Sequence, residues 1–140
     1  MEFLSPISRK GVDTSRLAVK PCGGTVPGTV HFETTPGSRN MFSWKVVHPS
    51  HTGNCTIRVG DTPDEAALRV VKPTDGSANE DGSFPCGRSE AAWEGKEVKI
   101  PTNLECDDCI VQIEWVTEKG TQHRCGDFMS IGTEIPECFG

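Results

Sequence analysis

His48 and His51 offer metal chemistry, because two imidazoles stand three positions apart in one polar segment that also contains Pro and Gly. Neutral imidazole is a common protein ligand for copper and zinc, and two ligands from one short turn can reach the same ion. A further donor would have to complete such a site. The same pattern is typical of two solvated histidines beside a turn, so both interpretations stay open at this point.

Cysteines form the second group of reactive side chains. The seven cysteines are Cys22, Cys55, Cys86, Cys106, Cys109, Cys125 and Cys138. So many cysteines in 140 residues, together with 15 Gly and 10 Pro, favour an oxidising compartment and a domain held by disulfides. We expect three disulfides with one cysteine left over, and the sequence alone does not determine the pairing.

The spacing of Cys106 and Cys109 allows two other interpretations. A zinc site would need a second close pair of ligands, and only His123 with Cys125 offers one. A thioredoxin-like redox motif lies at a strand-to-helix turn, whereas this pair opens a predicted strand. Structural disulfides are therefore the preferred interpretation.

The other side chains that could carry chemistry are few. Trp93 is the tryptophan that we predict at the surface, where it could stack on a sugar ring, whereas Trp44 and Trp115 fall on predicted inward faces. Asn54 begins an N-glycosylation sequon. We find no carboxylate pair placed for glycoside hydrolysis, no nucleophile elbow and no phosphate-binding loop.

Net charge and hydropathy exclude further classes. A net charge of -6 argues against a nucleic-acid partner, because phosphate binding needs clustered cations. No apolar run approaches the ~20 residues that span a bilayer. We expect a secreted monomer, located outside the cell or in the cell wall.

The first residues lack the charged and apolar regions of a signal peptide. We therefore interpret Met1 as an added start residue. Glu2 and Phe3 could likewise be residues added by cloning. On this interpretation residues 1–20 are an N-terminal extension and residues 21–140 form a single β-sandwich domain.

Alternation of apolar and polar residues with period two predicts short strands and no sustained helix. The predicted strands are 41–48, 54–60, 66–71, 97–100, 109–115 and 123–131. We expect the first two to form a hairpin, residues 74–85 to form an acidic loop, and Gly120 to mark a turn. Short strands separated by Gly and Pro indicate an all-β sandwich.

Three segments resemble secreted lytic polysaccharide monooxygenases and the fungal copper-acquisition factors of the same superfamily. Residues 6–13, followed by 21–24, are similar to the opening of those proteins. Residues 44–48, continuing to Cys55, resemble the strand and loop that carry their internal histidine. Residues 109–115, followed by 125–127, are similar to their penultimate strand and a Cys-x-Asp element.

The resemblance implies an immunoglobulin-like or fibronectin-like antiparallel β-sandwich with copper at one edge. In that family an N-terminal His binds copper through its α-amine and imidazole, together with an internal His, and in the copper-acquisition branch an Asp completes the site. By position, His48 or His51 is the internal ligand and Asp127 is the Asp. Copper-dependent polysaccharide oxidation would require a native N-terminal His, where this sequence has Met1.

Two functions follow from these observations. The first is a secreted copper-binding protein that acts on or near cell-wall polysaccharide or handles copper. The absence of Tyr favours binding or copper handling over oxidation. The alternative is a non-enzymatic extracellular module that is structural or binds glycan, with Trp93 as the contact.

Overall fold

The computed structural model describes residues 2–5, 33–46, 53–62, 67–86, 92–117 and 120–132. Within these ranges the chain forms strands, turns and loops, without an α-helix. Accordingly, no helix among the described residues is long and apolar enough to cross a membrane.

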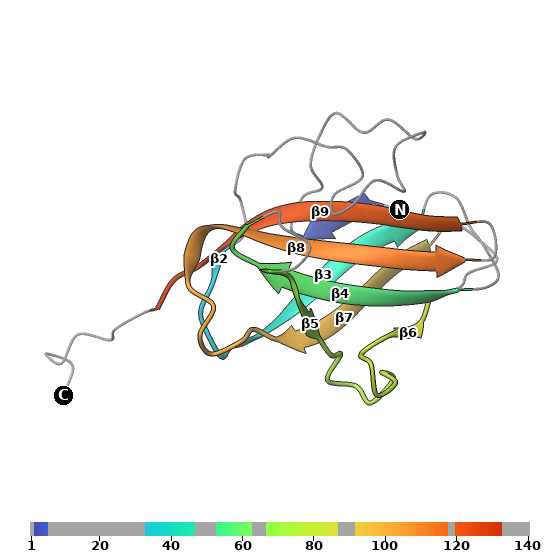
Figure 1. Ribbon diagram of the computed structural model, residues 1–140, viewed down its shortest axis with the longest axis horizontal. Helices are drawn as coiled ribbons and strands as arrows, with labels where there is room; N and C mark the ends of the chain where they lie inside the picture. Colours follow the sequence, from blue (N-terminus) through green and yellow to red (C-terminus); the bar gives the residue numbers. More distant parts are fainter. Residues whose placement is uncertain are drawn as a thin grey trace, which may run out of the picture.

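Two β-sheets face each other (Figure 1). The smaller sheet has the order β1 (Glu2–Ser5), β3 (Arg39–Val46), β7 (Ala92–Lys99). The larger sheet has the order β2 (Glu33–Thr34), β9 (Gly120–Ser130), β8 (Cys106–Thr117), β4 (Asn54–Gly60), β5 (Arg69–Val71), and β6 (Phe84–Pro85) also pairs with β4. The predicted β-sandwich is confirmed. One pairing departs from the antiparallel expectation, because β2 runs parallel to β9.

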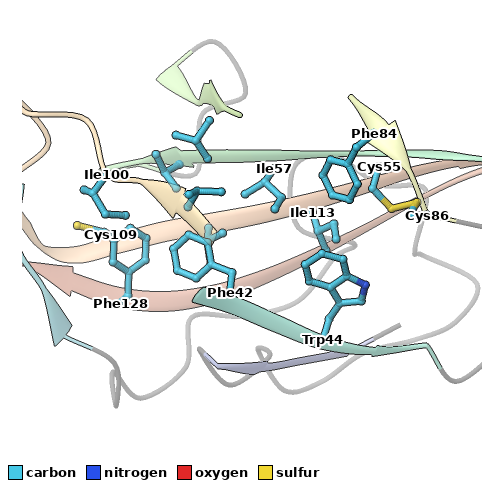
Figure 2. Close-up of a cluster of buried hydrophobic side chains, with 14 of the residues drawn as sticks. Phe42, Trp44, Cys55, Ile57, Phe84, Cys86, Ile100, Cys109, Ile113 and Phe128 are labelled. Carbon is cyan, nitrogen blue, oxygen red and sulfur yellow. A yellow bond between two sulfur atoms is a disulfide. The ribbon is translucent and has the colours of Figure 1, made fainter. Parts of the chain in front are cut away.

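The core lies between the two sheets and follows from the alternation in the strands. Phe42 and Trp44 of β3 are fully buried, as are the inward positions that we predicted in β4 and β8. Across the core, the ring centroids of Phe42 and Phe128 are 5.8 Å apart, and those of Trp44 and Phe84 are 6.1 Å apart. Figure 2 shows these rings packed with Ile57 and Ile113. Burial of such side chains is the main source of stability in a sandwich.

The predicted hairpin between residues 41–48 and 54–60 is wrong. β3 pairs with β1 and β7, whereas β4 pairs with β8, β5 and β6. The physical reason is that both strands present a strongly apolar face, and those faces pack against each other across the core. If the two strands had paired in a hairpin, both apolar faces would belong to one sheet. The opposite sheet would then have no comparable apolar face to pack against them.

The β8–β9 pair confirms the clearest prediction and extends it. Residues 109–115 and 123–131 were expected to pair around Gly120, and the observed strands run over 106–117 and 120–130. Gly120 has a φ of 130°, which favours glycine. Ile110 and Gln112, expected to face outward into solvent, are buried as well.

Strand β7 is longer than the predicted 97–100, because polar residues hide its pattern. Glu94 stands opposite Trp44 and Lys96 opposite Phe42. The Lys96 ammonium lies 5.4 Å from the centre of the Phe84 ring and 2.7 Å from Asp75 Oδ2. A lysine whose stem covers apolar surface while its charge is paired interrupts the apolar pattern without interrupting the strand.

The acidic loop is ordered by its own side chains. Ser77 N donates to Asp75 Oδ1 and Ser83 N donates to Asp81 Oδ1, both at 2.9 Å. The hydrogen bonds from Lys96 and Ser77 hold the pKa of Asp75 well below its usual range. The loop therefore contains two Asx turns and is fastened to β7 by the Lys96–Asp75 ion pair and by two hydrogen bonds that Thr74 donates to Glu97.

Strand β1 lies within the stretch that we expected to be an extension. Glu2 stands opposite Lys45, and Phe3 stands opposite Trp44. Residues 2–5 thus add a strand to the smaller sheet. The predicted domain boundary at residues 20–21 lies outside the described residues.

Gly53, the residue before β4, lies close to Trp115 and Val116, and substituting it tests whether this close packing requires glycine. It has a φ of 116°, and an added Cβ would lie 2.6 Å from both Trp115 Nε1 and the Val116 carbonyl oxygen. We expect Gly53→Ala to lower the free energy of unfolding by about 2–4 kcal/mol, through backbone strain and overpacking. Denaturant unfolding followed by tryptophan fluorescence measures this loss.

Gly76→Ala is the matched control. Gly76 also has a positive φ, 82°, but an added Cβ there meets nothing within 4 Å. Only the backbone term applies, so the loss should be about 1 kcal/mol. Equal losses in the two variants would contradict the proposed clash.

Candidate functional site

The start of β1 and the two strands that flank the predicted histidines meet at one end of the sandwich, here called the β3–β4 end. Glu2 at the start of β1 stands opposite Lys45, one residue before β3 ends. The chain returns in the other sheet at Asn54, the first residue of β4 (Figure 1). His48 and His51 belong to the connection between these strands and lie outside the described residues.

Trp93 belongs to the same end by register. It stands opposite Lys45, which itself stands opposite Glu2. Because Trp44 is fully buried, alternation puts positions 45 and 93 on the outer face of the smaller sheet. The side chain of Trp93 is not among those that the structure describes.

Asp127 is displaced from this end. It stands opposite Ile110, which stands opposite Gly60 at the far end of β4. Six residues of strand separate Gly60 from Asn54, which is about 20 Å. Asp127 is buried, with 5% of its surface exposed. Its role as a third ligand beside His48 or His51 stays a prediction, and it requires residues 47–52 to extend along the sheet.

Three buried polar atoms at the β3–β4 end were not anticipated from the sequence. Gln122 stands opposite Trp115 on the inner face of the larger sheet. Gln122 Oε1, Trp115 Nε1 and Trp44 Nε1 are buried without a hydrogen-bond partner. Buried polar atoms are normally satisfied, so this end of the core offers one acceptor and two donors to a water or a bound polar group.

A sequence signal for this cluster existed but was incomplete. Trp44 and Trp115 were both predicted to face inward, and each lies near the turn that ends its strand. Gln122 was missed because the strand was expected to begin one residue later, at His123. β9 in fact begins at Gly120, and this earlier start brings an amide onto the inner face opposite Trp115.

An ion-pair network occupies the outer face of the larger sheet. Glu114 Oε2 lies 2.9 Å from His123 Nε2, and Glu114 Oε1 lies 3.3 Å from an Arg58 guanidinium nitrogen. The same nitrogen donates to Gln112 Oε1 at 3.2 Å. His123 and Gln112 are almost fully buried although they are on the outer face.

Glu114 is held in its charged form by this network. Burial of the carboxyl raises its pKa, but the hydrogen bond with His123 and the charge of Arg58 outweigh burial and hold the pKa below its usual value. The hydrogen-bond partner of His123 is therefore a charged carboxylate.

The cysteines confirm disulfides and contradict the zinc alternative. Cys55 is bonded to Cys86, and Cys106 is bonded to Cys109. Cys125 is also disulfide-bonded, whereas Cys22 and Cys138 lie outside the described residues. A zinc site made of Cys106, Cys109, His123 and Cys125 would need three of these sulfurs as free thiolates.

The predicted glycosylation site and the predicted metal site can be placed only in part. Asn54 is exposed at the start of β4, so its side chain is accessible to a glycan, and its modification stays a prediction. Among the described residues, no three His, Cys, Asp or Glu side chains gather as metal ligands.

Comparison with known proteins defines the fold. No family model and no curated protein sequence matches this chain. A lytic polysaccharide monooxygenase AA15 from Thermobia domestica in the Cu(I) state matches with a TM-score of 0.58 at 15% identity, over 75% of this chain and 65% of that one. An AA10 lytic polysaccharide monooxygenase from Streptomyces lividans matches with a TM-score of 0.52 at 14% identity, over 76% and 61%.

A third solved structure extends over more of the chain. The Bacillus amyloliquefaciens CBM33 in complex with Cu(I) matches with a TM-score of 0.51 at 15% identity, over 88% of this chain and 76% of that one. This chain spans less than two thirds of the first two proteins. At such low identity the likeness is one of fold. The protein is a disulfide-bonded β-sandwich whose fold is similar to that of lytic polysaccharide monooxygenases.

The ion-pair network predicts a pH dependence of stability. The pKa of Glu114 is lower in the folded than in the unfolded chain, so its contribution is present above about pH 4.5 and is lost as the pH falls through the folded value. We expect Glu114→Gln to lower the free energy of unfolding by about 1–3 kcal/mol at pH 7. The difference from the unaltered protein should shrink as the pH falls below about 4.5.

The exposed loop residue Glu80 supplies the control, since Glu80→Gln removes the same charge outside the network. Denaturant unfolding at a series of pH values compares the three proteins. A Glu114→Gln profile parallel to that of Glu80→Gln would show that the network does not stabilise the fold.

Proposed function

We propose that this protein is a secreted copper-binding β-sandwich that works at or near polysaccharide, with the metal at the β3–β4 end. The observation that carries the proposal is the meeting of the β1 start with the two strands that flank His48 and His51. The fold supports it, since two of the similar solved structures are described with Cu(I). The disulfides fit an oxidising compartment.

The residues near this end fit copper by their chemistry. His48 and His51 would supply imidazole nitrogens, which suit Cu(II), and Glu2 of β1 stands opposite Lys45 of β3, the strand that precedes them. Gln122 Oε1 and the two indole N–H groups offer hydrogen bonds to a metal-bound water or to another polar ligand. Bound copper would supply redox chemistry, while the histidines would hold the ion and the amide and indole groups would hydrogen-bond to its polar ligands.

Copper titration tests the proposal. We expect one Cu(II) per chain, and His48→Ala or His51→Ala should weaken binding by more than about 100-fold, the upper range for a residue that only supports a ligand. His31→Ala is the matched control and should bind as the unaltered chain does. Calorimetry gives the affinity, and electron paramagnetic resonance gives the geometry of the bound ion.

Two further variants assign the remaining ligands. A chain released by cleavage of a leader, with His in place of Met1, tests the N-terminal brace that the resemblance implies, and it should bind copper more tightly and give an axial Cu(II) spectrum. Asp127→Asn should weaken binding only if Asp127 is the third ligand. Unchanged affinity in both the His48 and the His51 variants would remove copper binding at this end.

A non-enzymatic glycan-binding function is the second candidate. Trp93 lies by register on the outer face of the smaller sheet. The described side chains of that face include Met41, which is 50% exposed, and Ser43. An aromatic residue beside apolar and hydroxyl groups suits a sugar ring.

Retention on polysaccharide separates the two functions. If binding is independent of metal, the protein should remain on insoluble chitin, glucan or cellulose in the presence of a chelator. Trp93→Ala should then lower the affinity ~10-fold, a loss of about 1.4 kcal/mol. Val116→Ala, at a 48% exposed position of the larger sheet, should have no effect. Equal retention of both variants would exclude Trp93 as the contact.

A further inference from the structure

The Cys106–Cys109 disulfide lies within a single strand. Cys106 stands opposite Ser130 and Cys109 opposite Phe128, and the pairing of β8 with β9 shifts between them. Two residues of β8, Asp107 and Asp108, therefore face Met129 alone, which is a β-bulge. This disulfide closes the bulge and connects no separate elements.

The Cys55–Cys86 disulfide differs in every one of these respects. It joins β4 to the residue after β6 and bridges a separation of 31 residues, against three for Cys106–Cys109. The constraint that a disulfide puts on the unfolded chain grows with the loop that it closes. Opening Cys106–Cys109 therefore releases little chain entropy and leaves both sheets connected.

Access also singles out this bond among the described cysteines. Cys106 is partly exposed, whereas Cys55, Cys86, Cys109 and Cys125 are each at most 6% exposed. An external thiolate can reach a cysteine only from solvent, so Cys106, although it also packs against the core, is the more accessible half of this disulfide. The Cys106 carbonyl oxygen lies 3.2 Å from Cys109 Sγ, so a released Cys109 thiol has an acceptor for its proton.

Acidic residues flank Cys106 in the sequence on both sides. Glu105, Asp107 and Asp108 are exposed neighbours of Cys106 in sequence, and Glu105 also accepts from Gly132 N at 3.3 Å. This field repels an anionic attacking thiol and attracts a cationic one, to an extent that falls with ionic strength.

We propose that Cys106–Cys109 is a thiol-exchange site that selects its partner by charge. A thiolate attacks Cys106 Sγ, the new sulfur–sulfur bond forms as the bond to Cys109 breaks, and the electron pair leaves on Cys109 Sγ, which takes a proton from water. A second external thiolate then attacks the external sulfur of this mixed disulfide, and the bond to Cys106 breaks. The Cys106 thiolate takes a proton from water, and the two external thiols leave as a disulfide. Two electrons have passed from the external thiols to the protein, which now holds two thiols.

Stepwise labelling of the intact protein tests the site. Free thiols are first blocked with N-ethylmaleimide, and the protein is then exposed to low thiol concentrations at neutral pH. Newly formed thiols are labelled with deuterated N-ethylmaleimide and mapped by peptide mass spectrometry, while Trp44 and Trp115 fluorescence monitors the fold. We expect Cys106 and Cys109 to be labelled at least ~10-fold faster than Cys55, Cys86 and Cys125, with the fold retained.

Charge selection is measured with three small thiols. For each thiol, the rate per thiolate at 10 mM ionic strength is divided by its rate at 1 M salt, which cancels the intrinsic nucleophilicity of that thiol. This ratio should fall in the order cysteamine, 2-mercaptoethanol, mercaptoacetate. The double variant Asp107→Asn, Asp108→Asn should narrow the spread of these ratios. The double variant Cys106→Ser, Cys109→Ser should show no early labelling.

Earlier labelling of Cys55, Cys86 or Cys125 would overturn the assignment of the exchange site. Ratios that do not depend on thiol charge, or a spread that the Asp107→Asn, Asp108→Asn variant leaves unchanged, would overturn the charge selection. Neither outcome depends on whether the protein binds copper.

Discussion

The packing of two apolar sheet faces against each other is the constraint on which the rest of this structure depends. β3 contributes Phe42 and Trp44 from one sheet, and Phe128 and Phe84 meet them from the other. Because side chains alternate along a strand, filling this space fixes the register of every strand that borders it. The same packing brings the starts of β1 and β4 and the end of β3 to one end of the molecule, and toward that end the inner face of β9 carries the polar residues Arg124 and Gln122.

Charged and polar groups are arranged around this core according to their burial. Glu114 can be buried on the outer face because His123 and Arg58 both contact its carboxylate. Lys96 can stand opposite Phe42 because its ammonium pairs with Asp75 and lies near the Phe84 ring. In contrast, the indole N–H groups of Trp44 and Trp115 have no partner, which is unusual for buried donors. Buried polar groups that have partners thus belong to the part of the molecule that supports the fold, whereas the two buried donors without partners lie at the end that we associate with function.

Much of the fold was predictable, since alternation alone identified β4 and the β8–β9 pair. Pairing was less predictable, because the same alternation serves two strands in one sheet and two strands in opposite sheets, which is why β3 and β4 were mistaken for a hairpin. β7 was underestimated because Glu94 and Lys96 occupy positions opposite apolar residues. At the site, the polar cluster of Gln122 with Trp115 depends on cross-strand register, which the sequence does not contain. His48 and His51 remain predictions.

The measurement that tests the central claim most directly is the paramagnetic broadening of backbone amide signals when one equivalent of Cu(II) is added to the labelled protein. The account predicts selective loss of signals from Lys45, Asn54 and Gln122 at the β3–β4 end, with Arg39 and Gly60 at the far end unaffected. Loss of the Asp127 signal as well would add Asp127 to the ligands. Broadening centred on the far end, or no selective broadening at all, would contradict a copper site between β1, β3 and β4.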